Sequence, residues 1–169
     1  ITHGRVAHIT GDAVHEGRGK CQFRNRGRRG CPFGGYFSSN ASTLPAAERT
    51  GNMTLRPNSI AHEIVYDEKS KKATGVKVID TETKEELFYE AQIIFCCASA
   101  IASNAILMQS KSKRFPNGLG NDSGELGHNI MDHHLGVGAY AIVDEHQDDY
   151  YIGRRPGGMY IPRFRNLDE

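Results

Sequence analysis

The sequence of 169 residues predicts an α/β fold in which an antiparallel β-meander precedes a buried strand and a helix. Over residues 60–91, charged turns separate segments in which polar and apolar residues alternate, which is typical of strands with one solvent-exposed face. Residues 93–97 are apolar on both faces. Apolar residues then recur at helical spacing (Ile101, Ala105 and Met108). This order indicates a meander inserted before the last buried strand of a doubly wound sheet.

The first part of the chain shows little periodicity. Residues 1–40 are rich in glycine and basic residues, so we expect loops or extended structure there. A short helix is predicted over residues 42–50, because Ser and Thr precede Pro45, an Ala-rich run follows, and Gly51 ends it.

The predicted meander covers residues 53–91. Charged segments at residues 67–72 and 80–84 supply its turns. Its strands are expected at residues 53–56, 60–66, around 76–78 and 87–91. Neighbouring strands joined by such short turns pair in an antiparallel manner.

A different kind of element follows the meander. The apolar run at residues 93–97 predicts a strand buried on both faces, and a turn of small residues, 98–100, leads into a helix that extends to residue 109. A buried strand, a small turn and a helix N-terminus form an arrangement that binds phosphates or nucleotides. After a Gly-rich loop at residues 111–127, strands are expected at 135–143 and 159–164, where a second sheet begins.

Composition limits the partners and the compartment. The formal charge of +1 gives no overall field that would recruit nucleic acid or an anionic membrane. No apolar run approaches membrane-spanning length, so no membrane span is expected. Four cysteines, two of them adjacent, do not form a secreted disulfide framework. We therefore expect a cytoplasmic protein, or a periplasmic one if an export signal has been removed upstream.

Three motifs occur in a fixed order. The first is Gly-Cys-Pro-Phe-Gly-Gly-Tyr at residues 30–36, leading into Ser-Thr-Leu-Pro-Ala-Ala at 42–47. The second is Asn-Met-Thr-Leu-Arg-Pro-Asn-Ser at residues 52–59, and the third is Gly-His-Asn-Ile-Met-Asp-His at 127–133. In order and spacing this set resembles the glucose–methanol–choline (GMC) family of flavoenzymes, over roughly residues 20–140.

The resemblance implies a fold, a cofactor and an activity. Residues 1–134 would form part of an FAD-binding, Rossmann-like domain with the meander inserted, and residues 135–169 would begin an antiparallel substrate-domain sheet. The implied function is an FAD-dependent dehydrogenase or oxidase that oxidises a CH–OH group, with a sugar or polyol as the expected substrate, by hydride transfer to flavin. Its partners would be this alcohol and an electron acceptor.

The resemblance also implies site residues. The backbone of Ala61 would pair with the adenine of FAD, Ala98 and Ser99 would form a turn facing the cofactor, and Asp132 and His133 would form a corner near it. Ser99 stands where the family usually has glycine. No catalytic residue is assigned, because the family's catalytic His is expected downstream. Residues 1–169 alone should therefore be inactive. Because the family's Gly-rich turn for the pyrophosphate is not found among them, they should bind FAD weakly or not at all.

Other functions remain open at this point. The basic segment at residues 20–29 could serve a non-catalytic module that binds nucleic acid or phosphate. Cys21 and Cys31 do not have zinc-finger spacing, and the histidines at 128, 133 and 134 lie in a segment too short for a stable helix. We therefore predict no metal site and no nucleic-acid partner.

Overall fold

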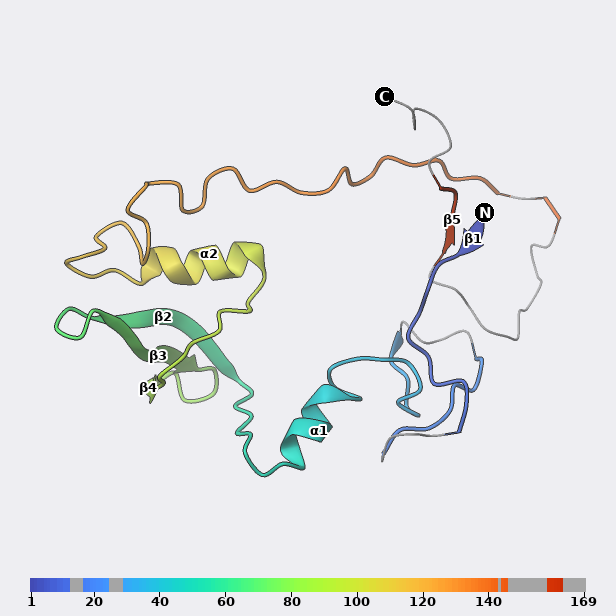
Figure 1. Ribbon diagram of the computed structural model, residues 1–169, viewed down its shortest axis with the longest axis horizontal. Coiled ribbons are helices and arrows are strands. Elements are labelled where there is room, and N and C mark those ends of the chain that lie inside the picture. Colours follow the sequence, from blue (N-terminus) through green and yellow to red (C-terminus); the bar gives the residue numbers. More distant parts are fainter. Residues whose placement is uncertain (13–16, 25–28, 143, 146–157, 163–169) are drawn as a thin grey trace. The chain divides into compact units, whose positions relative to one another are not determined.

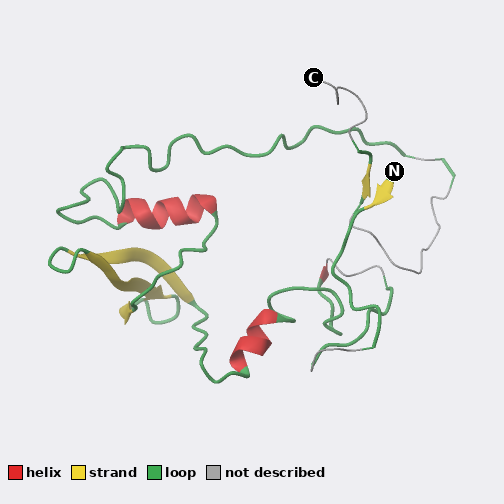
Figure 2. Ribbon diagram, in the orientation of Figure 1, coloured by secondary structure: helices red, strands yellow, loops and turns green. Residues whose placement is uncertain are grey.

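The computed structural model describes residues 1–12, 17–24, 29–142, 144–145 and 158–162 (Figure 1). The chain divides into two compact units, one of Ile1–Thr54 with Tyr140–Glu169 and one of Leu55–Ala139. The domain boundary predicted at residue 134 stays a prediction. Figure 2 shows helix, strand and loop in both units. No helix in the described ranges combines the length and the apolar character that a membrane crossing needs.

The unit of residues 55–139 contains the predicted meander. Its strands are β2 (Ser59–Asp67), β3 (Lys72–Asp80) and β4 (Glu86–Glu90), and they form one antiparallel sheet in the order β2-β3-β4. Aspartates end two of the strands and accept hydrogen bonds from the turns that follow, as in Asp67 Oδ2 with the N–H of Ser70 at 2.7 Å. The meander is thus confirmed, but the strand expected at residues 53–56 is wrong, because no strand of the described residues pairs with that segment.

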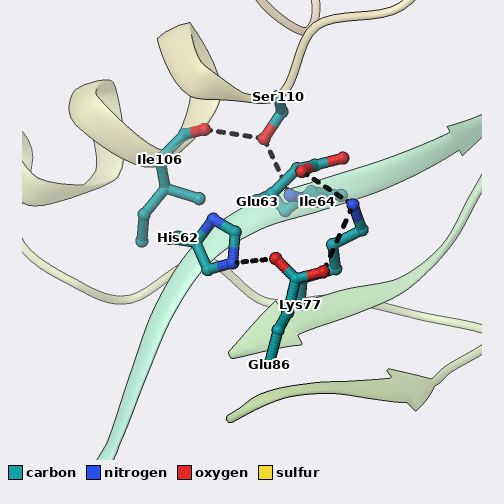
Figure 3. A network of polar contacts seen from close by, with 7 residues as sticks. All are labelled: His62, Glu63, Ile64, Lys77, Glu86, Ile106 and Ser110. Carbon is teal, nitrogen blue, oxygen red and sulfur yellow. Dashed lines mark hydrogen bonds and ion pairs between the residues drawn. The ribbon is translucent and has the colours of Figure 1, made fainter. Parts of the chain in front are cut away.

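Helix α2 (Ala100–Gln109) packs on β2 and confirms the predicted helix. The most buried apolar residues of the chain's described part are Ile64 and Val78, each 7% exposed. Ser110, directly after α2, is 2% exposed. Its hydroxyl donates to the carbonyl of Ile106 at 2.6 Å and accepts the N–H of Ile64 at 2.7 Å (Figure 3). One side chain therefore joins the end of the helix to the sheet.

The loop after α2 folds back over the helix end. The N–H of Leu119 donates to the carbonyl of Leu107 at 2.9 Å, which satisfies one of the carbonyls left free at a helix C-terminus. Gly118 has a φ of 112°, and a Cβ there would lie 2.9 Å from the same carbonyl oxygen, so glycine is required. The Phe115 ring meets that of Tyr66 edge-on at 5.0 Å and anchors the loop to β2.

The strand expected at residues 93–97 is not formed. Ile93 is 73% exposed and Phe95 84% exposed, in a segment without strand structure. A strand that is apolar on both faces needs hydrogen-bonded neighbours and packed layers on both sides. The described residues supply neither, because the sheet of this unit is limited to β2, β3 and β4.

The other unit is built from short pairings. Strand β1 (Thr2–His3) pairs antiparallel with β5 (Met159–Tyr160), and His8 forms an isolated bridge with Tyr36. Helix α1 (Thr43–Glu48) confirms the helix predicted over residues 42–50. The guanidinium of Arg18 donates to the carbonyl of Gly34 at 2.8 Å and to Ser42 Oγ at 3.2 Å, which ties the N-terminal loops to the start of α1.

The two strands expected in the last part of the chain have different outcomes. The strand predicted at residues 135–143 is wrong for residues 135–142, which are exposed and pair with no other strand in the described part of the chain. Residue 143 lies outside the described residues. Of the strand predicted at 159–164, β5 forms the first two residues, and residues 163–164 again lie outside the described range.

A close approach in the sheet generates the first prediction. A Cβ at Gly75 would lie 2.5 Å from the ring of Phe88 and would also collide with the carbonyl oxygen of Tyr89. Gly75→Ala should lower the free energy of unfolding by about 1–3 kcal/mol, measured by urea unfolding. The control is Gly138→Ala, where the Cβ would meet nothing within 4 Å. Equal losses in the two variants would contradict the assigned packing.

The buried hydroxyl generates the second prediction. Ser110→Ala leaves the N–H of Ile64 buried without a partner, so we expect a loss of about 1–3 kcal/mol in the free energy of unfolding. Ser103→Ala is the control, because Ser103 lies in helix α2 itself and its hydroxyl makes no hydrogen bond with the described residues. A Ser110→Ala variant as stable as the Ser103→Ala variant would show that the bridge does not hold the helix to the sheet.

Candidate functional site

All five residues predicted for the cofactor site lie in the unit of residues 55–139, and all are exposed. Ala61 lies in β2, Ala98 and Ser99 precede α2, and Asp132 and His133 lie in the loop after it. Helix α2 packs on β2, and the two elements run in the same direction (Figure 1). The structure therefore brings the strand and the turn to one end of the unit.

The backbone of Ala61 faces a free sheet edge. Because β2 is an outer strand of the sheet, half of its amide and carbonyl groups have no strand partner among the described residues. The N–H of Thr81 donates to the carbonyl of Asn58 at 2.8 Å, so Asn58 faces β3. The pairing continues without a shift from Ser59 to Ala61, and backbone groups alternate along a strand. The amide and carbonyl of Ala61 therefore point away from β3.

A β-bulge separates Ala61 from the next edge-facing amide. The N–H of Ile64 also faces the edge, because it donates to Ser110. Positions three residues apart normally face opposite edges of a strand. Here the register shifts between Ala61 and Glu63, so that His62 is an extra residue opposite β3. The bulge lets both amides face the same edge, one held by Ser110 and the other open.

Charged side chains surround this bulge in a cluster that sequence reasoning missed (Figure 3). Lys77 Nζ lies 3.1 Å from Glu63 Oε2 and 3.6 Å from Glu86 Oε1. His62 Nε2 lies 3.0 Å from Glu86 Oε2, a close polar contact that does not form a hydrogen bond. The hydrogen bond and charge of Glu63, followed by the charge of Glu86, raise the pKa of Lys77. The only available signal was the alternation of charges, which does not give the register.

The turn before α2 is strained. Ser99 has a φ of 70° and a ψ of 167°, a region that is essentially restricted to glycine and costs about 1–3 kcal/mol for other residues. Its side chain makes no capping hydrogen bond, while its carbonyl accepts the N–H of Ser103 at 2.9 Å. The glycine expected at this position from the family resemblance is thus the residue that the backbone geometry favours.

The Asp132–His133 corner is a local turn. The N–H of His133 donates to Asp132 Oδ1 at 2.6 Å, and both residues are exposed. Among the described residues, no hydrogen bond or ion pair joins this corner to Ala61 or to the turn before α2. The structure thus shows no direct polar contact between the corner and the other candidates among the described residues.

The remaining sequence candidates lie in the other unit or alone. In the basic segment 20–29, Arg24 stacks over the ring of Phe33 at 4.8 Å, and residues 25–28 lie outside the described ranges. Burial raises the pKa of the Cys31 thiol, but hydrogen bonds from the backbone around it, that of Tyr36 first, lower this pKa by more. The pKa of the thiol is therefore below its ordinary value. Within the described ranges, His, Cys, Asp and Glu side chains form no group of three that could hold a metal ion.

The strain at Ser99 can be measured. Ser99→Gly should raise the free energy of unfolding by about 1 kcal/mol, because relief of the strain exceeds the extra chain entropy of glycine. Ser103→Gly, inside α2, should lower it by about 0.5–1 kcal/mol. Urea unfolding of both variants would check the opposite signs, and a destabilised Ser99→Gly variant would contradict the backbone assignment.

Comparison with known proteins supports the resemblance. The family model described as GMC oxidoreductase matches residues 5–135. The chain is 31% identical over 139 residues to 2-methyl-1,2-propanediol dehydrogenase of Mycolicibacterium austroafricanum, covering 82% of this chain and 24% of that protein. It is 27% identical over 119 residues to the fructose dehydrogenase large subunit of Gluconobacter japonicus, covering 70% and 21%. The chain thus spans about a quarter or less of these relatives' length. Since the family match extends over well more than half of its residues, the chain belongs to the GMC oxidoreductase family.

Proposed function

We propose that this chain is part of an FAD-dependent oxidoreductase that oxidises a CH–OH group of a sugar or polyol, and that it carries the surface for the adenine end of FAD. Family membership supports an oxidoreductase that uses a flavin. The names of the two relatives, a diol dehydrogenase and a fructose dehydrogenase, support a small hydroxylated substrate.

The open edge at Ala61 carries this proposal. Adenine presents a hydrogen-bond donor and acceptors on its edge, and an amide and carbonyl of one residue that face the same way can pair with such an edge. Ala61 is exposed and its side chain is small, so a flat ring can approach the backbone. The chemistry of the strand therefore fits the nucleotide part of FAD.

The turn before α2 fits a neighbouring part of the same cofactor. Ala98 and Ser99 are small and exposed, and the first N–H groups of a helix favour negative charge. Ser99 makes no capping bond that would occupy them. When bound, FAD supplies the acceptor for the hydride that leaves the alcohol carbon. The proposed role of the chain's own residues is to hold and orient the nucleotide, and none of them is assigned as the catalytic base.

Two further assignments complete the proposal. Asp132 and His133 lie near the cofactor only if segments that are not in contact here approach one another in the enzyme. The partners are the alcohol and an electron acceptor. Binding of nucleic acid or phosphate by the segment 20–29 would instead require affinity without a flavin, and nothing in the geometry of Arg24 or Cys31 favours it.

A single proline substitution, which removes one backbone N–H, tests the adenine contact. Ala61→Pro removes an N–H that faces the free edge and makes no ladder bond, so the sheet should survive. In the product of the complete gene, FAD affinity measured by reconstitution of the apoprotein should fall about tenfold, the loss of one hydrogen bond. Ala61→Val, which keeps the N–H, is the control.

The outcomes of this test are distinct. Retained affinity in Ala61→Pro would remove the adenine contact from Ala61. A wild-type protein that contains no flavin and oxidises neither fructose nor a 1,2-diol with an artificial acceptor would refute the proposed function as a whole.

A further inference from the structure

The side of helix α2 that faces the sheet carries a second serine, Ser103, seven residues before Ser110. This side is half-buried or buried at residues 103, 104, 106, 107 and 110, whereas the other residues of the helix are exposed. Positions seven residues apart share one side of a helix. Ser103 therefore lies on the same side as Ser110, whose hydroxyl accepts the N–H of Ile64 at the outer edge of β2 at 2.7 Å.

Ser103 also lies at the level of Ala61 along the two elements. Helix α2 and β2 run in the same direction, so the residues before Ser110 accompany the residues before Ile64 (Figure 1). Seven residues of a helix rise about 10 Å. Three residues of a strand, the step from Ile64 back to Ala61, also cover about 10 Å. The pair of Ser103 and Ala61 thus corresponds in position to the bonded pair of Ser110 and Ile64.

The second pair does not form the hydrogen bond of the first. Among the described residues, the Ser103 hydroxyl makes no hydrogen bond, and the N–H of Ala61 faces the free edge without a partner. The bulge at His62 accounts for this difference, because a bulge bends its strand, and β2 curves away from α2 toward its first residues (Figure 1). Two polar groups on facing elements are therefore left open at the same level.

The two open groups suit a purine ring. The backbone of Ala61 presents one donor and one acceptor, and the hydroxyl of Ser103 can donate and accept. Adenine carries its amino donor and its acceptor nitrogens on more than one edge. A ring that pairs with Ala61 on one edge therefore still has a nitrogen free to accept a hydrogen bond from a hydroxyl.

We propose that Ser103 is a second binding residue for the adenine of FAD, whose hydroxyl donates to a ring nitrogen while another edge of the base pairs with the backbone of Ala61. This inference deepens the proposed function and rests on it, because both place the nucleotide at the free edge of β2. Ser103 holds the nucleotide and takes no part in the chemistry at the flavin.

The test uses the apoprotein of the complete gene product. FAD binding is followed by flavin fluorescence, and adenosine monophosphate, which has the adenine but no flavin, is measured as a competitor. The variants are Ser103→Ala, Ser103→Thr and Gln109→Ala. Gln109 is the matched control, because it is a polar residue on the exposed side of the same helix. Urea unfolding of each apoprotein checks that the helix remains stable.

Ser103→Ala should weaken the binding of both FAD and adenosine monophosphate about five- to tenfold, the loss of one hydrogen bond, while the stability of the apoprotein stays that of the wild type. Ser103→Thr keeps the hydroxyl and should restore both affinities. Gln109→Ala should bind both ligands as the wild type does. A serine with a purely structural role would instead lower the stability and leave the affinity of the folded protein for adenosine monophosphate unchanged.

Three results would overturn the inference while FAD binding, and with it the proposed function, stands. Equal affinities of Ser103→Ala and the wild type for both ligands would remove Ser103 from the site. Weaker binding of FAD alone would place the hydroxyl at another part of the cofactor. A wild type in which adenosine monophosphate does not compete with FAD would remove the adenine contact from both Ser103 and Ala61. A complete protein that contains no flavin would instead refute the proposed function, and this inference with it.

Discussion

The hydroxyl of Ser110 is the contact on which the unit of residues 55–139 depends. Its apolar core is small, with Ile64 and Val78 as the deeply buried side chains among the described residues, and helix α2 leaves Ile101 76% exposed. Apolar burial alone therefore holds α2 weakly against the sheet. The fully buried Ser110 adds two short hydrogen bonds, to Ile106 and from Ile64, where water cannot compete.

The same contact shapes the candidate site. By taking the amide of Ile64, Ser110 closes one position on the outer edge of β2, and the bulge at His62 then presents a second position at Ala61. An exposed strand edge is normally a liability for aggregation, but a short stretch with a specific partner is a binding surface. Scaffold and candidate site thus share one strand, and the ion pairs of Lys77 lie beside the bulge.

Strain marks the second part of the site. The chain keeps a glycine-like backbone at Ser99 although a serine occupies the position. Such a conformation persists only where the surrounding structure determines it, here by the segment that leaves β4 and by the first turn of α2. The turn therefore keeps a glycine-like backbone without the residue that suits this conformation best.

The sequence by itself determined the meander, both helices and the family, because alternation, helical spacing, capping residues and ordered motifs are local signals. It also pointed to Ala61 and Ser99, though by resemblance only. It did not determine whether residues 93–97 and 135–142 form strands, since strand formation needs partners that a local pattern cannot supply, and these segments have none among the described residues. Only the tertiary structure decided the register of β2 against β3. That register fixes the bulge at His62, the cluster around Lys77 and the outward amide of Ala61, because each depends on which residues far apart in the sequence lie opposite one another.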